Sequence, residues 1–191
     1  MKIKIFVFLS ILTLSISCTD EVLPKPKAFL RLSYSEATYQ KVISDCPYTI
    51  QISQFSSIEF QNNCWAKIHY PNLKATIHLT YREVDNNLID VLKEVEKLTY
   101  EHTVKADNIP MAEAFENRIN RVYGKIINVE GDVASNIQFH ATDSVKNVLF
   151  GALYFEVKPN YDSILPTIKY IELDIKNLME SVEWKNQSIN L

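Results

Sequence analysis

The chain has 191 residues, with 20 Lys or Arg against 23 Asp or Glu, and a net charge of −3 at pH 7. This even balance excludes a strongly basic surface, so we expect no nucleic acid partner. With three glycines in all there is no phosphate-cradling loop, and the GxSxG, HExxH and CxxC patterns are missing from the sequence. We therefore expect no enzymatic activity and no cofactor.

The N-terminus resembles a lipoprotein signal peptide covering residues 1–17. Lys2 and Lys4 precede an uncharged apolar segment of about a dozen residues, short of the roughly 20 that a transmembrane helix needs. Small residues stand directly before Cys18, as in the box where the cysteine thiol is acylated and begins the mature chain. Ser15 occupies a place where Leu is usual, so a plain secreted protein is the alternative. We expect lipidation of Cys18.

Residues 18–28 form a tether between this anchor and the rest of the chain. Pro24 and Pro26 favour extended backbone, which makes the tether a short, semi-rigid spacer. Because lipoproteins carry more than one acyl chain, such an anchor is stable. The length that remains, residues 29–191, suits a single globular domain.

The two other cysteines, Cys46 and Cys64, would lie in an oxidising compartment where a disulfide persists. A loop of that length, once closed, constrains the unfolded chain by about 3 kcal/mol. Spacing alone does not bring two Cα atoms together, so two free buried thiols remain the alternative.

Alternation of apolar and polar residues predicts an antiparallel hairpin at 66–70 and 75–81, joined by the turn PNLK. One face is apolar. The other carries Trp65, His69 and His78, with the two histidines close to opposite each other.

A helix should follow, capped by Asp85, Asn86 or Asn87. Apolar residues at helical spacing form one stripe, which ends at a histidine: Leu88, Val91, Leu92, Val95, Leu98 and then His102. We expect His102 to be a core or boundary residue.

Three further strands are predicted near residues 121–130, 136–142 and 148–157. The last contains VLFGALYFEV, which is apolar on both faces and so belongs in the middle of a sheet covered on both sides. Gly151 within it indicates the close approach of another backbone.

A second helix closes the chain, with Asp162 or Ser163 as its cap and Pro166 in its first turn. Its buried face should consist of residues spaced by three and four: Ile164, Ile168, Ile171, Ile175, Leu178 and Val182. Two helices on a mainly antiparallel sheet of about five to seven strands make an α+β fold. The order of elements is similar to that of PsbP-like or Mog1-like domains.

Histidine placement is the nearest sign of a site. His69 and His78 share a face of the hairpin, and His140 points away from the apolar side of its own strand. Three imidazoles on one sheet face could bind zinc if their nitrogens converged on one ion. Such histidines are more often solvated or packed under a helix, so we do not expect a metal site.

Several strings spread over residues 24–184 resemble the gliding motility lipoprotein GldD family. They are PKPKAFLRL, WAKIHYPNLKATIHLTY, NIQFHATDS, GALYFEVKPN with DSILP behind it, and the terminal Trp184. The resemblance implies an envelope lipoprotein of gliding Bacteroidota that is required for movement over surfaces and linked to type IX secretion. It implies no enzymatic activity.

The same resemblance bears on location and modification. It favours the outer membrane, facing the periplasm, although Asp20 and Glu21 resemble surface-export signals. Asp-Ser followed by an apolar residue occurs at Ser144 and Ser163 and is similar to the O-glycosylation pattern of this phylum. Asp-Ser also suits turns and helix caps, and an occupied cap hydroxyl would disfavour Ser163.

Two functional interpretations follow. The first is a tethered assembly or stabilising component that docks onto other gliding and secretion lipoproteins through Trp65, His69 and His78, or through an edge strand. The second is a periplasmic small-ligand or metal-binding module that uses the histidine-bearing sheet face. The sequence favours the first, because no carboxylate is adjacent to these histidines in their strands.

Overall fold

The computed structural model describes residues 34–101, 106–156 and 160–185. The predictions for the signal peptide, Cys18 and the tether lie outside these residues, as does His102.

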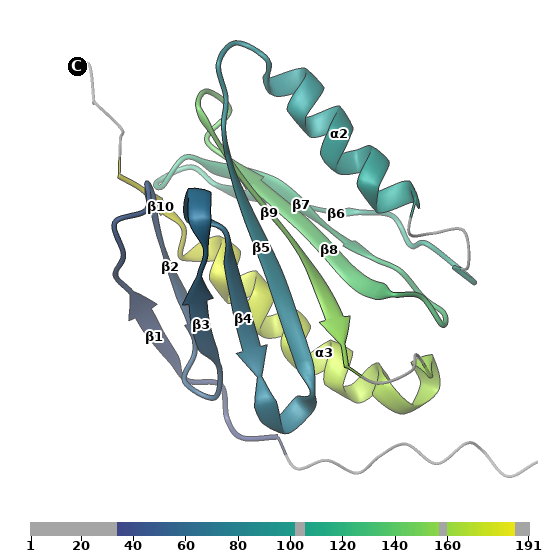
Figure 1. The fold of residues 1–191 in the computed structure, drawn as a ribbon. Coiled ribbons are helices and arrows are strands. Elements are labelled where there is room, and N and C mark those ends of the chain that lie inside the picture. The colour runs from purple at the N-terminus through teal and green to yellow at the C-terminus, as the bar shows by residue number, and fades with distance from the viewer. Residues whose placement is uncertain (1–33, 102–105, 157–159, 186–191) are drawn as a thin grey trace, which may run out of the picture.

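A seven-stranded antiparallel sheet forms the centre of the described fold (Figure 1). Its spatial order is β3 (Ser57–Phe60), β4 (Ala66–Tyr70), β5 (Ala75–Glu83), β9 (Asn147–Phe155), β8 (Ser135–Thr142), β7 (Val122–Asn128) and β6 (Glu113–Asn117). A small sheet joins β1 (Tyr39–Val42), β2 (Tyr48–Ser53) and β10 (Glu183–Trp184). With the helices α2 (Leu88–Glu101) and α3 (Tyr161–Glu180), this confirms the predicted α+β class.

Strand β9 is the middle strand of the large sheet, as its two apolar faces predicted. Leu149 and Leu153 point to the side of α3, which we call the α3 face, whereas Val148 and Phe150 point to the side of α2, the α2 face. Gly151 leaves room for neighbours, and the nearest of them is a side chain. A Cβ there would lie 2.5 Å from the Phe139 ring and 3.1 Å from the His78 carbonyl oxygen, so the predicted backbone is near but the aromatic ring is nearer.

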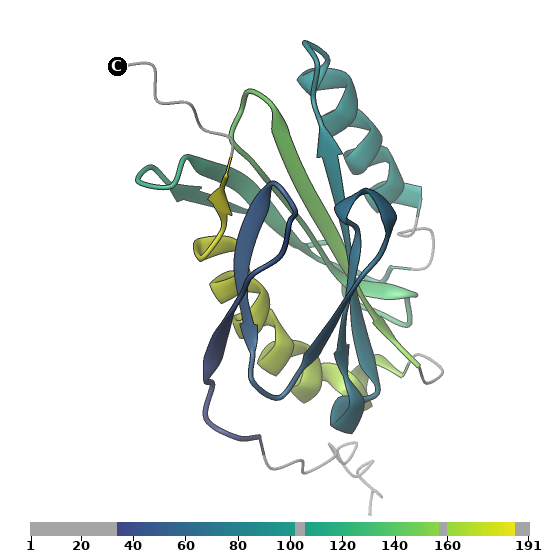
Figure 2. The same cartoon turned by 60° about the vertical axis from the view of Figure 1, so that its left-hand side comes forward.

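Helix α3 contacts β2 of the small sheet and β8 of the large one (Figures 1 and 2). Its predicted apolar face is confirmed, because Ile168, Ile171 and Ile175 are buried in the main core. The predicted cap is wrong. The helix begins at Tyr161 after the N-cap Asn160, so Pro166 falls in the second turn.

The true start of α3 depends on a residue far away in sequence. Asp132 Oδ1 accepts a hydrogen bond of 2.7 Å from the Tyr161 backbone N–H. A carboxylate at a helix N-terminus satisfies an otherwise unpaired donor and interacts favourably with the helix dipole. Asp132 therefore accepts a hydrogen bond at the start of the helix, the capping role that the sequence predicted for Asp162 or Ser163.

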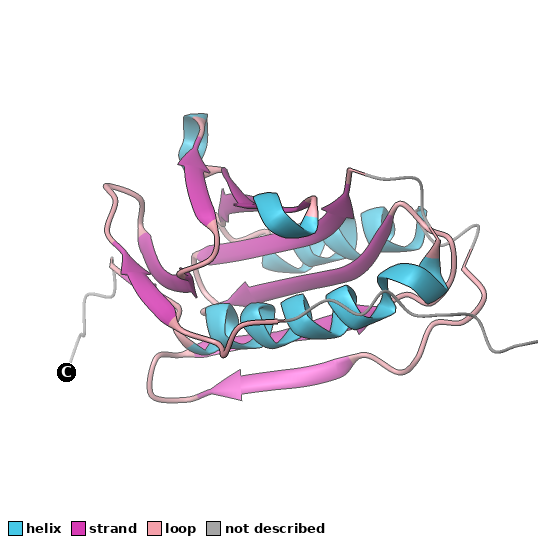
Figure 3. Ribbon diagram, turned by 90° about the horizontal axis from the view of Figure 1, so that it is seen from below, coloured by secondary structure: helices cyan, strands magenta, loops and turns pink. Residues whose placement is uncertain are grey.

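Helix α2 begins directly after Asn87, within the predicted cap region, and lies on the opposite side of the large sheet. Val91 packs with Val84 and Val148 in a small core separate from the main one. Seen from below, strands of the sheet separate the two helices (Figure 3). The sheet is thus covered on both sides at β9.

A disulfide joins Cys46 to Cys64, whose Cα atoms are 5.5 Å apart. Cys46 precedes β2, and Cys64 ends the short 3-10 helix η2 (Asn62–Cys64) that leads into β4. The Tyr48 hydroxyl donates a 2.8 Å hydrogen bond to the Cys64 carbonyl oxygen. The small sheet is therefore connected covalently to the large sheet near β4.

Candidate functional site

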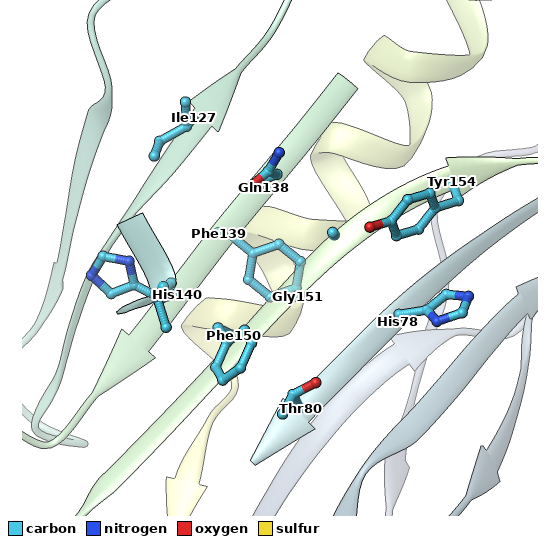
Figure 4. Close-up of a pocket in the computed structure, with 11 residues that line it drawn as sticks. His78, Thr80, Ile127, Gln138, Phe139, His140, Phe150, Gly151 and Tyr154 are labelled. Atoms are coloured by element: carbon cyan, nitrogen blue, oxygen red, sulfur yellow. The ribbon is translucent and has the colours of Figure 1, made fainter. Parts of the chain in front are cut away.

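A pocket of about 580 Å³ lies on the α2 face of the large sheet (Figure 4). We call it the Gln138 pocket. Its walls come from four adjacent strands and from α2, and the residues are His78, Thr80, Val95, Ile127, Gln138, Phe139, His140, Phe150, Gly151, Ala152 and Tyr154. The volume falls within the range of about 300–1,000 Å³ that is typical of small-molecule sites.

Strand register explains why these side chains meet. Ala152 of β9 lies between His78 of β5 and Gln138 of β8, its direct partners on either side. Phe150 lies in the same way between Thr80 and His140. Because side chains in neighbouring strands point to the same face at paired positions, all six belong to the α2 face. The floor of the pocket thus consists of two cross-strand rows of three residues: His78, Ala152 and Gln138 in one, and Thr80, Phe150 and His140 in the other.

Gln138 is the most unusual polar group in the pocket. Its side chain is only 6% exposed, and its Nε2 atom has no hydrogen-bond partner. A buried amide donor without a partner costs about 1–3 kcal/mol, so proteins seldom leave one unless a ligand or water occupies the space. The sequence analysis did not single out Gln138. The signal that the sequence offered was a polar residue between two apolar residues, Ile137 and Phe139, of a predicted strand; the structure shows that this strand is buried on both faces.

His140 is also buried, at 7% exposure, on the face away from Ile137, Phe139 and Ala141 that alternation predicted; of the two alternatives, solvated or packed under a helix, the structure shows the second. The cause is α2, which covers this part of the sheet. Burial and the positive charge of Lys125 lower the pKa of His140 to about 4, an effect that the Glu96 carboxylate only partly offsets. Glu96 of α2 forms an ion pair with Lys125 of β7 beside the imidazole. His140 is therefore neutral at pH 7.

His78 lies at the other side of the pocket, where its ring makes an edge contact with Tyr154 at 5.1 Å between centroids. Partial burial, together with the charges of Lys67 and His69, lowers the pKa of His78. Burial likewise raises the pKa of the Tyr154 hydroxyl. All titratable groups that line the pocket are thus uncharged at neutral pH.

The chemistry that such a pocket offers is binding. Its lining contains no Asp, Glu, Lys or Arg, and most of its side chains are aromatic or aliphatic. Gln138 supplies a neutral donor, while Thr80 and Tyr154 supply hydroxyl groups. A site of this composition fixes the orientation of a ligand with a few polar contacts and gains affinity from apolar burial.

The structure does not bring the three histidines together. By register, His78 lies opposite Lys67 and His69 opposite Thr76, so the two histidines are diagonal neighbours and not a facing pair. His140 is farther away, with β9 between its strand and that of His78. Among the described residues, no cluster of His, Cys, Asp or Glu could hold a metal ion.

His69 has a carboxylate neighbour that the sequence did not reveal. Its Nε2 lies 3.7 Å from Glu59 of β3, a strand that was not predicted, and its Nδ1 lies 3.2 Å from the Thr76 hydroxyl. These contacts link the imidazole to β3 on one side and β5 on the other. The prediction that no carboxylate is adjacent to these histidines in their own strands is not contradicted, since Glu59 belongs to another strand.

Trp65 is 42% exposed and lies at the entry to β4. Its indole N–H donates a 3.2 Å hydrogen bond to the Tyr81 carbonyl oxygen, which fixes the ring on the surface. His69 is half-buried and His78 exposed on the same face. Helix α2 packs beside β9, and no helix of the described residues covers β3 and β4 on this side (Figure 1). We call this uncovered part of the sheet the open half.

The two Asp-Ser sites differ in exposure. Ser144 is exposed in the β8–β9 turn with a left-handed φ of 65°. Asp143 Oδ1 holds this turn by accepting hydrogen bonds from the N–H groups of Val145, Lys146 and Asn147. Ser163 is half-buried in the first turn of α3. Ser163 is not the helix cap, so its hydroxyl is not occupied by a capping hydrogen bond. The difference between the two serines is that Ser144 is exposed and Ser163 is half-buried.

Comparison with solved structures shows a similarity to the solution structure of the cyanobacterial PsbP protein (CyanoP) from Synechocystis sp. PCC 6803. The sequences are 11% identical, the match covers 78% of this chain and 94% of the other, and the TM-score is 0.49. No curated protein matches the chain. Within the described residues, neither helix combines the length and apolar character that crossing a membrane requires.

Sequence comparison with protein families gives a specific result. The family described as gliding motility lipoprotein GldD matches residues 19–184, which include every helix and strand described above. This confirms the resemblance seen in the separate strings of the sequence. The chain belongs to the gliding motility lipoprotein GldD family.

Proposed function

We propose that the protein acts without catalysis, as an assembly or stabilising component of the gliding and type IX secretion machinery. It would be held by its lipid at the outer membrane and face the periplasm. Membership of a gliding motility lipoprotein family supports the motility role and the lipid anchor. Its partners would be other lipoproteins of the same machinery.

The observation that carries the docking role is the open half of the α2 face. Trp65 is exposed there beside polar side chains, and its ring is already fixed by the hydrogen bond to Tyr81. A fixed aromatic side chain loses little conformational entropy on binding, which is why such residues so often dominate protein interfaces. His78 and the Glu59–His69 pair supply a polar rim around it.

The composition of the Gln138 pocket agrees with a binding protein. No charged side chain enters its lining, and the pKa of both histidines is lowered, that of His140 by burial and that of His78 by partial burial and the charges of Lys67 and His69. General acid–base catalysis works best when the catalytic pKa lies near the operating pH, and the pKa of His140 lies well below that.

Site-specific photocrosslinking in living cells tests the docking surface. A photoreactive amino acid at Lys67, on the open half, should give a discrete crosslinked product with an envelope protein. The matched control is Leu173, which is exposed on the outer side of α3. Products from Leu173 and none from Lys67 would place the interface elsewhere. Trp65→Ala should remove the Lys67 product without changing the amount of the protein.

A further inference from the structure

One polar atom in the floor of the Gln138 pocket, Gln138 Nε2, has no hydrogen-bond partner among the described residues. This atom is buried in the floor of a mainly apolar pocket, and the partners of Gln138 in the sheet are Ile127 of β7 and Ala152 of β9 (Figure 4). We propose that this pocket binds a neutral, mainly apolar small molecule that carries a carbonyl or ether oxygen, and that Gln138 donates a hydrogen bond to this oxygen. The proposal is independent of the docking role of the open half.

The shape of the pocket defines the rest of the ligand. Its apolar walls come from Phe150, Ile127 and Val95. Ala152 has a small side chain, so it leaves space above the centre of the floor. A larger residue at position 152 would fill the middle of the space. The ligand should therefore have a flat or elongated apolar body that lies over Ala152 with its oxygen towards β8.

Charge excludes other classes of ligand. The lining has no Lys or Arg that could neutralise an anion, and no Asp or Glu that could pair with a cation. Lys125 and Glu96, which approach His140 from outside the lining, already neutralise each other in an ion pair. Burying an unpaired charge costs far more than burying a carbonyl that accepts one hydrogen bond. A phosphate, a carboxylate or an ammonium compound is therefore disfavoured.

Two fluorescent probes separate the apolar and polar parts of this proposal. Nile red is neutral and carries a carbonyl oxygen, whereas diphenylhexatriene is a pure hydrocarbon. Both should bind the mature chain, residues 18–191, carrying Cys18→Ala, which has neither the apolar segment of the signal peptide nor acyl chains and so needs no detergent. Gln138→Leu should weaken Nile red binding about 5–10-fold, the loss expected for one hydrogen bond, and leave diphenylhexatriene binding unchanged.

Filling the pocket provides the second arm. Ala152→Phe should weaken the binding of both probes at least about tenfold, because its ring would occupy the ligand space. Ser57→Phe is the matched control, since it adds the same ring on the same face at the exposed strand β3, outside the pocket. Circular dichroism and thermal unfolding establish that each variant is folded, with Ala152→Leu as the substitute if Ala152→Phe is not.

The results discriminate clearly. Equal Nile red affinity in the wild type and Gln138→Leu would overturn the hydrogen bond to Gln138. Equal affinity in the wild type and both position 152 variants would overturn the pocket itself. In the wild type, Nile red should also shift the side-chain amide resonances of Gln138 in a nitrogen-15 NMR spectrum, and unshifted resonances at saturation would contradict the proposal.

Discussion

Cys46 and Cys64 form a disulfide that links the start of β2 to the start of β4, and so ties the small sheet to the large one. Cys46 is buried in the main core, and Cys64 packs against it. The bridge closes a loop of 18 residues in sequence separation. A loop of this size reduces the entropy of the unfolded chain enough to stabilise the fold by about 3 kcal/mol.

Replacing both cysteines by alanine should therefore lower the free energy of unfolding by about 3 kcal/mol. Urea unfolding of the wild type and the Cys46→Ala/Cys64→Ala variant measures the difference. The wild type in reductant serves as the control and should approach the variant. If reductant leaves the wild-type midpoint unchanged, the bridge contributes nothing to stability.

Gly151 and Phe139 should be energetically coupled. An alanine Cβ at position 151 would lie 2.5 Å from Phe139 Cζ, which is closer than packed atoms allow, and 3.1 Å from the His78 carbonyl oxygen, which is a tight contact. Gly151→Ala should therefore destabilise the fold by about 1–3 kcal/mol. In a Phe139→Leu background, which makes room, the same change should cost clearly less.

A double-mutant cycle of thermal or urea unfolding measures this coupling. An equal cost of Gly151→Ala in both backgrounds would mean that the Phe139 ring is not what the glycine accommodates, and that the His78 carbonyl oxygen is the limiting neighbour.

His140 should make stability depend on pH. The native state keeps the imidazole neutral down to a pKa of about 4, whereas the unfolded chain takes up the proton near 6.5. The unfolded state thus binds more protons between these values, so stability falls as the pH decreases through this window. The loss from this one residue is at most about 3 kcal/mol.

His140→Gln removes the titrating group and should flatten the stability profile between pH 7 and pH 4. Urea unfolding at several pH values compares the two proteins, with the high-pH end as the reference where both side chains are neutral. Parallel profiles for the wild type and His140→Gln would show that other groups cause the acid destabilisation.

The sequence predicted the elements whose apolar residues repeat with a clear period. The hairpin β4–β5, the helices α2 and α3, and the strands β7, β8 and β9 all correspond to predicted segments. The missed strands are short or lack alternation. In β2, five of the six residues are buried, and β10 has only two residues. Their pairing depends on partners far away in the chain, which local patterns do not contain.

The site was harder to predict for the same reason. Alternation placed His140 correctly on one face of β8, but only the packing of α2 decides that this face is buried there. The carboxylates of Glu59 and Glu96 approach His69 and His140 from other elements. Tertiary contacts thus decide that this face, for which the sequence left open solvation or packing under a helix, forms a pocket.

Glycosylation should favour Ser144. We propose that Ser144, exposed in a turn fixed by Asp143, is the modified serine, and that the half-buried Ser163 is not. Intact-mass measurement of protein purified from the envelope of its native host should show added hexose mass that Ser144→Ala removes and Ser163→Ala keeps. A wild-type mass without hexose would contradict this assignment.

Co-purification from envelope membranes tests the central claim, a membrane-tethered assembly role, most directly. The acylated protein should be crosslinked and recovered beside a Cys18→Ala version of equal abundance. Recovery of gliding and secretion lipoproteins with the acylated protein, and their loss with Cys18→Ala, is the predicted result. Equal recovery from both versions, or recovery of no envelope protein from either, would contradict the account.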